Sequence, residues 1–278
     1  MLKYRTYGNK PYNVVVVHGG PGAPGSLGYV ARELSKSHSV LEPFQSAGSI
    51  SGQIDELHNY INENCPGKTK LIGHSWGAWL AYMYAAQHPE KVEKLILVAA
   101  GSFDERYNFN LTNLRLSRLN EENRKEALEI INWMNHTAED NPDKLKRFSE
   151  LMELADFYDC EDNNEDSAEF QYDIFTSVWK EADRMRRFGE LVQFGKRIKC
   201  PVIAIHGNYD THPAQGVEEP LSKLLKKNFR FIGLEQCGHY PWKEKHAKEK
   251  FFEILETELS PARVTPKRPA LTLWSFFF

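Results

Sequence analysis

The feature that most constrains the fold is a pentapeptide at residues 73–77, which reads Gly-His-Ser-Trp-Gly. A short apolar run at 70–72 precedes it, and a helix-like run at 78–86 follows it. A G-x-S-x-G sequence between a strand and a helix is typical of a sharp turn that lifts the serine hydroxyl above the edge of a sheet. Glycine is needed at both ends of such a turn, because a Cβ would collide with neighbouring backbone. The pattern favours Ser75 as an exposed nucleophile. The alternative is an ordinary glycine-rich turn in which Ser75 is a helix cap.

Apolar runs that favour strands recur along the chain and alternate with helical patterns. The four valines at 14–17 are typical of a strand that is buried on both faces, as in a parallel sheet. Strands are predicted at 13–17, 39–41, 70–72, 94–100, 200–205 and 229–234, and helices at 27–36, 53–64, 78–86, 221–227 and 246–258. This alternation predicts an α/β fold with a mostly parallel sheet that is flanked by helices.

Residues 102–196 break the alternation, because they contain helical patterns and almost no strand-like run. Helices are predicted there at 122–134 and 142–157. We therefore expect a core formed by residues 1–101 and 197–260, with an inserted helical cap at 102–196. An irregular C-terminal tail at 261–278 ends in an apolar octet, which could dock on its own fold, mediate self-association or be an artefact.

Composition gives no reason to expect a nucleic acid or an anionic membrane surface as a partner. The 278 residues carry a formal net charge of −3. The cysteines at 65, 160, 200 and 237 lack metal-ligand spacing, and free thiols in a reducing compartment are the simplest interpretation. The N-terminus is too polar for a signal peptide, and no stretch is long enough for a transmembrane helix. A soluble cytoplasmic protein is expected, and its oligomeric state stays open.

A serine nucleophile needs a base that takes its proton and an acid that orients the base. His239 follows the last predicted strand, and Asp210 follows the strand that ends at residue 205. Sites in α/β sheets form at these carboxyl ends. The order Ser75, Asp210, His239 is the chain order expected for a nucleophile on a strand-to-helix turn. Asp104 and Asp183 are weaker alternatives for the acid.

Residues 18–22 read His-Gly-Gly-Pro-Gly and follow the first buried strand. Glycines there let backbone N–H groups approach a ligand, so the N–H groups of Gly20 and Trp76 are the predicted oxyanion donors. A phosphate-binding loop is disfavoured, because the lysine and hydroxyl of G-x-x-x-x-G-K-[ST] are missing. The predicted substrate contacts are Gly19 in the glycine loop, Trp79 near the turn and Trp179 in the cap. The two aromatic side chains would form an apolar pocket.

From about residue 11 to about residue 259 the chain resembles the α/β-hydrolase family. Residues 18–22 and the Gly-x-Ser-Trp-Gly turn resemble the proline iminopeptidase branch. The resemblance implies an eight-stranded or shortened sheet with a helical cap, and Ser75, Asp210 and His239 as nucleophile, acid and base. An Asp-x-Arg-Gly-x-Gly-x-Ser stretch usual in that branch is replaced at 42–49 by Glu-Pro-Phe-Gln-Ser-Ala-Gly-Ser. The branch also implies that cap carboxylates hold a substrate amine; the acidic run at 153–169 could do this or form solvated surface.

The predicted function is hydrolysis of an ester or amide bond in a small molecule or short peptide, through an acyl-enzyme and without a metal or organic cofactor. Within enzymes, the alternatives are a carboxylesterase and an aminopeptidase. From another class, the chain could be a catalytically silent ligand-binding protein that kept the fold.

Overall fold

The computed structural model describes residues 3–136, 141–161 and 171–260. Its centre is a seven-stranded sheet in the order β1-β3-β2-β4-β5-β6-β7 within this described part of the chain. The strands are β1 (Tyr4–Tyr7), β2 (Val14–Val17), β3 (Val40–Pro43), β4 (Thr69–His74), β5 (Val92–Val98), β6 (Val202–Gly207) and β7 (Phe229–Leu234). Only the β1–β3 pair is antiparallel among the described pairings, so the prediction of a mostly parallel sheet is confirmed.

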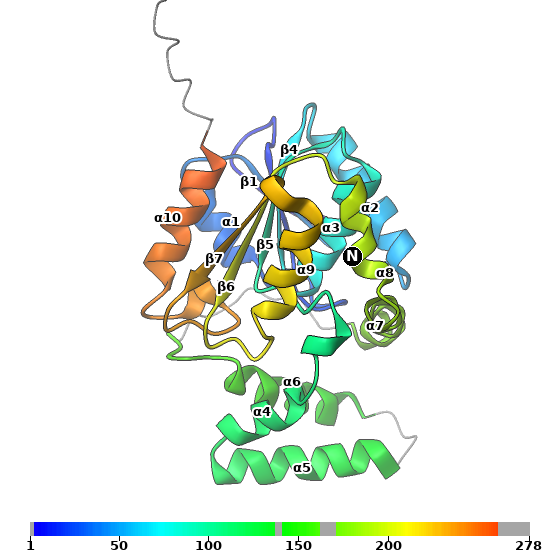
Figure 1. The fold of residues 1–278 in the computed structure, drawn as a ribbon, viewed down its shortest axis with the longest axis vertical. Helices are drawn as coiled ribbons and strands as arrows, with labels where there is room; N and C mark the ends of the chain where they lie inside the picture. Colours follow the sequence, from blue (N-terminus) through cyan, green and yellow to red (C-terminus); the bar gives the residue numbers. More distant parts are fainter. Residues whose placement is uncertain (1–2, 137–140, 162–170, 261–278) are drawn as a thin grey trace, which may run out of the picture.

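Helices cover both faces of the sheet, as Figure 1 shows. On one face lie α1 (Gly28–Leu34) and α10 (Lys248–Leu259), and on the other lie α2 (Ile50–Asn64), α3 (Trp76–Gln87) and α9 (Gln215–Leu225). The valines of β2 alternate between the two sides, because Val14 and Val16 pack with α1 and α10 whereas Val15 and Val17 pack with α2 and α3. This is the two-sided burial that the uninterrupted valine run predicts.

A run of helices connects β5 to β6. These inserted helices are α4 (Leu111–Arg118), α5 (Glu121–His136), α6 (Pro142–Ala155), α7 (Tyr172–Arg187) and α8 (Glu190–Gln193). In Figure 1, α4, α5 and α6 lie together beyond the carboxyl ends of the strands, whereas α7 and α8 lie near α2 and α3. Buried side chains such as Leu116, Ile130 and Leu151 give the α4–α6 group a small core of its own.

Short 3-10 helices occupy several connections. They are η1 (Glu105–Tyr107), η2 (Phe194–Arg197), η3 (Lys226–Asn228) and η4 (Pro241–Lys243). The last of these follows β7 and leads toward α10, so it forms part of the loop that carries His239.

The structure differs from the sequence prediction at several elements, and two of these differences have a plain physical reason. Helix α9 begins at Gln215, before the predicted start at 221, although Pro220 lies inside it. Proline disfavours a helix interior, but the burial of Val217 and Leu221 against the sheet stabilises the helix more than Pro220 destabilises it. Strand β1 was not predicted, because an edge strand with half-exposed, mostly polar residues carries little apolar pattern.

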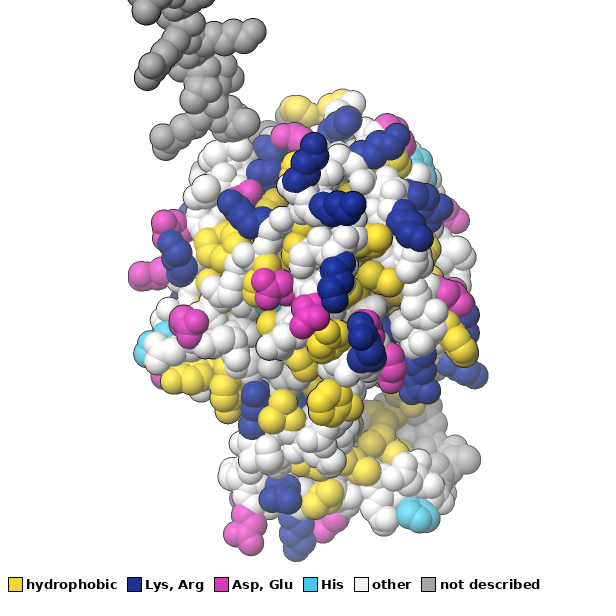
Figure 2. Space-filling view, viewed as in Figure 1, with side chains coloured by type: hydrophobic (Ala, Val, Ile, Leu, Met, Phe, Trp, Pro, Cys, Tyr) yellow, Lys and Arg dark blue, Asp and Glu magenta, His cyan; other side chains and the backbone are white. Residues whose placement is uncertain are grey.

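Charged side chains of both signs are mixed with apolar ones on the face shown in Figure 2. None of the helices formed by the described residues has both the length and the apolar character that a membrane crossing requires. The predictions made for the tail at 261–278, and for the acidic residues at 162–169, lie outside the described residues.

The packing of α10 generates a stability prediction. Phe251 is 1% exposed and packs against Trp242, whereas Phe188 is 74% exposed. We expect Phe251→Ala to lower the free energy of unfolding by about 3–5 kcal/mol, because it removes a buried ring and leaves a cavity. Phe188→Ala, the same truncation at the surface, should change it by less than about 0.5 kcal/mol. Urea denaturation of both variants measures the difference, and equal losses would contradict this packing.

Candidate active site

Ser75 lies on a strained turn between β4 and α3. Its φ of 51° and ψ of −116° are unfavourable for a residue with a side chain, and such strain persists only where the surroundings enforce it. The N–H of Ser75 donates to Val98 O at 3.0 Å. A Cβ on Gly73 would collide with the backbone of Gly77, and one on Gly77 would collide with Val17 O. The turn therefore needs both glycines, as its sequence predicts.

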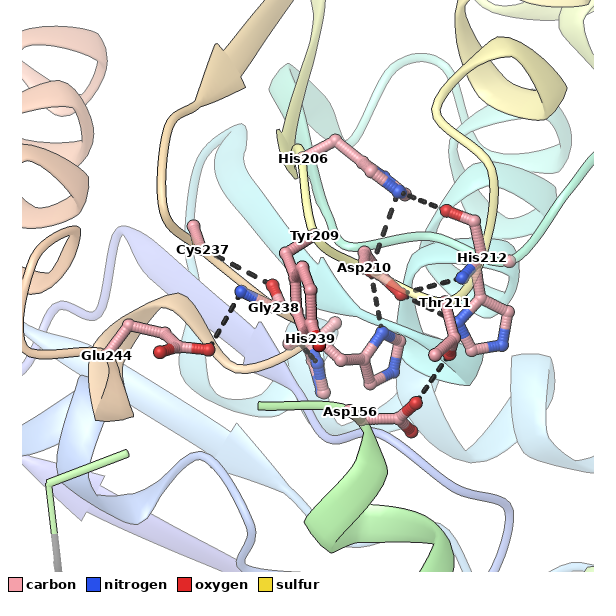
Figure 3. Close-up of polar contacts among 12 residues, drawn as sticks. Asp156, His206, Tyr209, Asp210, Thr211, His212, Cys237, Gly238, His239 and Glu244 are labelled. Atoms are coloured by element: carbon pink, nitrogen blue, oxygen red, sulfur yellow. Dashed lines mark hydrogen bonds and ion pairs between the residues drawn. The ribbon is translucent and has the colours of Figure 1, made fainter. Parts of the chain in front are cut away.

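His239 and Asp210 meet at the same end of the sheet. His239 lies in the loop after β7, and Asp210 in the loop after β6. His239 Nδ1 donates to Asp210 Oδ2 at 2.8 Å, and the two side chains are 4% and 0% exposed (Figure 3). Since a carboxylate can only accept, Nδ1 carries the proton and Nε2 keeps a lone pair. The imidazole is thus held in the tautomer that can accept a proton.

The turn at Ser75 is joined to the His239 loop through the preceding residue. His74 Nε2 donates to His239 O at 2.9 Å, and the two rings lie 4.9 Å apart. No hydrogen bond joins the side chains of Ser75 and His239 in the described part of the chain. Contacts of this kind are often long before substrate binds. The structure therefore places Ser75 beside the His239 loop without a formed hydroxyl–imidazole bond.

Two further histidines surround the Asp210 carboxylate, and the sequence analysis missed both. His212 donates to Asp210 Oδ1 from its backbone N at 2.9 Å and from Nδ1 at 3.0 Å. His206 Nε2 lies 3.5 Å from Oδ2 and donates to His212 O at 2.8 Å. The signal that could have found His212 is its place two residues after Asp210, where an Asp side chain commonly bonds its own turn.

Burial and charge act in opposite directions on the two titrating groups. Burial raises the pKa of Asp210, but His239, His206 and His212 outweigh it and hold that pKa well below 3.8. Burial lowers the pKa of His239, but the charge and hydrogen bond of Asp210 outweigh it, so the pKa lies above 6.5. Asp210 is therefore ionised at neutral pH and stabilises a protonated His239.

The glycine loop after β2 passes directly against the turn at Ser75. A Cβ on Gly19 would lie 2.6 Å from His74 Nδ1 and 3.4 Å from Ser75 Cβ. Gly20 has a φ of 56°, which glycine adopts without strain. Trp76 opens α3, where the first N–H groups of a helix have no partner within the helix. The two predicted oxyanion donors therefore belong to segments that meet at Ser75.

The predicted aromatic contacts lie together in one stack. Trp79 is 1% exposed, and its Nε1 donates to Gly101 O at 3.0 Å. Trp179 of α7 stacks on it with ring centroids 5.8 Å apart, and Phe175 continues the stack at 6.1 Å. Trp179 is 37% exposed, so it is the tryptophan of this stack that can offer surface to a ligand.

The alternative acids have other partners. Asp104 caps η1 and forms an ion pair with Arg106 at 2.6 Å. Asp183 pairs with Arg187 at 2.8 Å and with Arg186. Of the three candidate acids, Asp210 is the one that bonds His239.

The described part of the acidic run is a row of ion pairs rather than a set of open carboxylates. Glu153 pairs with Lys243, Asp156 with Arg115, Asp159 with Lys245 and Glu161 with Lys248, at distances of 2.9, 2.6, 2.6 and 2.6 Å. These acids therefore already have cationic partners within the chain, which leaves little unpaired charge among them for a substrate amine.

The same cluster can be tested as a metal site. Asp210, His212 and His239 offer ligand atoms within 4.8 Å of one another. However, both imidazoles direct Nδ1 at the Asp210 carboxylate and donate hydrogen bonds to it. Both Nδ1–H groups are therefore engaged with the carboxylate, and this arrangement fits proton transfer better than metal binding.

Known proteins resemble this chain in sequence and in fold. It is 24% identical over 252 residues to pimeloyl-[acyl-carrier protein] methyl ester esterase of Nitrosomonas europaea, covering 87% of this chain and 93% of that one. It is also 24% identical over 159 residues to proline iminopeptidase of Clostridioides difficile, covering 52% and 54% of the two chains.

Solved structures agree on the fold. VinJ matches with a TM-score of 0.66 at 20% identity, covering 92% of this chain and 93% of that one. The monoacylglycerol lipase of Paleococcus ferrophilus matches with a TM-score of 0.58 at 18% identity, covering 93% and 98%. The family model for the alpha/beta hydrolase fold matches residues 54–245, which is more than half of the chain. The protein therefore belongs to the α/β-hydrolase family.

Proposed function

We propose that this protein is a serine hydrolase that cleaves an ester or amide bond of a small substrate with Ser75, His239 and Asp210. One observation carries the proposal. Asp210 holds His239 through Nδ1, which leaves the Nε2 lone pair available, at the end of the sheet where Ser75 lies on a strained turn. A buried acid–imidazole pair beside a partly exposed serine is the arrangement that acyl transfer requires.

In the proposed mechanism, His239 Nε2 takes the proton of Ser75 Oγ while that oxygen attacks the substrate carbonyl. The N–H groups of Gly20 and Trp76 stabilise the oxyanion that develops. Protonated His239 then gives its proton to the leaving group, which leaves an acyl group on Ser75. A water molecule that His239 deprotonates releases the acid product. Asp210 orients the imidazole throughout and stabilises its positive charge.

Among substrates, an ester of a small acid is favoured over a peptide with a free amine. The described acids of the segment 153–161 are paired with cations of this chain, so they offer no vacant carboxylate for an amine. The methyl ester esterase that resembles the chain matches over most of its length, whereas the iminopeptidase matches over about half. Aminopeptidase activity is the second candidate, favoured by the His-Gly-Gly-Pro-Gly loop at 18–22.

Trp179 is proposed to form a wall of the acyl pocket, with Trp79 supporting it from behind and Gly19 lining the opposite side. Helix α7 starts beside the glycine loop, because Gln171 N donates to Gly22 O at 2.7 Å. In this proposal residues 102–196 form a cap over a core of residues 1–101 and 197–260, and the ligand lies between them.

Substitution of the nucleophile tests the proposal directly. We expect Ser75→Ala to lower hydrolysis of p-nitrophenyl esters by at least ~10³-fold and to abolish labelling by a fluorophosphonate probe. Ser51→Ala, on the exposed side of α2, is the matched control and should keep both activities. Free-amine and N-acylated amino acid p-nitroanilides, assayed in parallel, separate an esterase from an aminopeptidase. A Ser75→Ala variant that retains turnover would refute the proposal, and wild type that neither turns over nor labels would favour a ligand-binding protein.

The pH dependence should report His239. The pKa of His239 is raised above 6.5, and the base must be neutral to accept a proton. We therefore expect kcat/KM to fall as the pH decreases through the pKa of His239. In Asp210→Asn no carboxylate offsets the effect of burial, so the pKa of His239 should decrease. The remaining activity should then begin to fall at a lower pH than in wild type. The same change should lower kcat by about 10³–10⁴-fold. A pH–rate profile of both proteins measures this, and an unshifted limb would argue against His239 as the base.

The proposed acyl pocket makes a separate prediction. Trp179→Ala should raise KM for esters of bulky apolar acids by about tenfold, because it removes an exposed ring from the pocket, and should affect acetyl esters little. Phe188→Ala, which truncates an exposed aromatic residue beyond the end of α7, is the control and should change neither value. Equal effects on short and long acyl groups would place Trp179 outside the pocket.

A further inference from the structure

The residue that ends α6 bonds to both loops that carry the acid and the base. Asp156 O accepts the backbone N–H of His239 at 2.8 Å. Its carboxylate, 3% exposed, accepts the hydroxyl of Thr211, which directly follows Asp210 (Figure 3). One inserted-helix residue therefore contacts the neighbour of the acid through its side chain and the base itself through its backbone.

The Asp156 carboxylate is balanced by an arginine from another inserted helix. Arg115 of α4 donates to it from Nε at 2.9 Å and from a terminal nitrogen at 2.6 Å, and the Arg115 side chain is 18% exposed. A two-pronged pair of this kind fixes orientation as well as charge. One turn further along α4, Arg118 donates to Tyr209 O at 2.8 Å, on the other side of Asp210.

The backbone beside His239 packs closely against the end of α6. A Cβ on Gly238 would collide with Asp156 O, so the chain before His239 is glycine where α6 presses on it. The N–H of Gly238 donates to Glu244 Oε1 at 2.8 Å, and the two carboxylate oxygens of Glu244 also accept the N–H groups of Tyr158 and Asp159. Residues 156–159 are thus bonded to the His239 loop both at His239 itself and through Glu244.

We propose that Asp156 and Arg115 are positioning residues that hold the Asp210 and His239 loops together and place a buried pair of opposite charges beside His239. This inference rests on the proposed function, because it assigns His239 as the base. Nothing in the proposed chemistry requires a second ion pair at this place. Its burial against both loops, rather than at the surface, is what points to a role in the site.

The charges act on His239 in opposite directions. Burial lowers the pKa of His239 most strongly, Asp210 raises it, Asp156 raises it further, and Arg115 lowers it. Other titratable groups against the ring or its loop are His74, His212, Tyr240 and Glu244, and His206 and Lys243 lie around them. Removing one charge of the pair leaves the other unbalanced, so the two single substitutions should shift the base in opposite directions.

The test compares the pH dependence of kcat/KM in four variants of the full chain, with p-nitrophenyl acetate as substrate, from about pH 5 to about pH 9. Asp156→Asn should move the acidic limb to lower pH, and Arg115→Gln should move it to higher pH, each by several tenths of a unit to about one unit. The double variant should return the limb close to wild type but keep a kcat about tenfold lower, because the loops are no longer held. Glu150→Gln, an exposed acid of α6 that pairs with Arg147, is the control and should match wild type.

Either of two results would overturn the inference: single variants whose limbs coincide with wild type, or limbs that both move in the same direction. Circular dichroism melts establish that each variant is folded. If a single variant does not fold, Arg115→Lys tests the inference instead, because lysine keeps the positive charge but cannot make the two-pronged guanidinium contact with Asp156. An unshifted limb with lowered kcat then supports the inference, and wild-type kcat refutes it. Ser75→Ala distinguishes the two proposals, since loss of turnover there together with unshifted limbs refutes only the role of Asp156 and Arg115.

Discussion

The hydrogen bond between Asp210 and His239 is the interaction on which the proposed site depends. It joins loops that leave two neighbouring parallel strands, so it can form only because β6 and β7 end at the same edge of the sheet. The carboxylate is buried, and such a group is stable only when donors surround it. The backbone and imidazole N–H groups of His212 supply two of these donors. Asp210 therefore stabilises its own loop as well as orienting His239.

A second constraint comes from close backbone packing at the turn. Gly73, Gly77 and Gly19 each lie where a Cβ would meet neighbouring atoms, so the strand, the turn and the glycine loop are pressed together around Ser75. The strain in the Ser75 backbone is held by this packing and by the bond to Val98. Rigid surroundings of this kind suit a site whose groups must not reorganise during reaction.

Local sequence predicted most of the sheet and the residues of the proposed site, because buried strands and glycine-rich turns leave strong patterns. The valines at 14–17 and the G-x-S-x-G turn are examples. It did not predict His206, Arg115 or Asp156, since their roles depend on contacts between residues far apart in the chain. Nor did it show that Glu153, Asp159 and Glu161 pair with lysines at 243–248, because either run alone resembles a solvated surface.

The backbone bond from His239 N to Asp156 O has a consequence for how such a protein can diversify. The helices between β5 and β6 would be the natural place to alter which acyl group is accepted. Here the same helices also supply an acceptor for the main chain of His239, the proposed base, and a charge beside it. An exchange of the whole insertion for that of a relative would therefore change reactivity together with selectivity. New specificities should arise more readily by point changes on α7, because Asp156, at the end of α6, and Arg115, on α4, would stay in place.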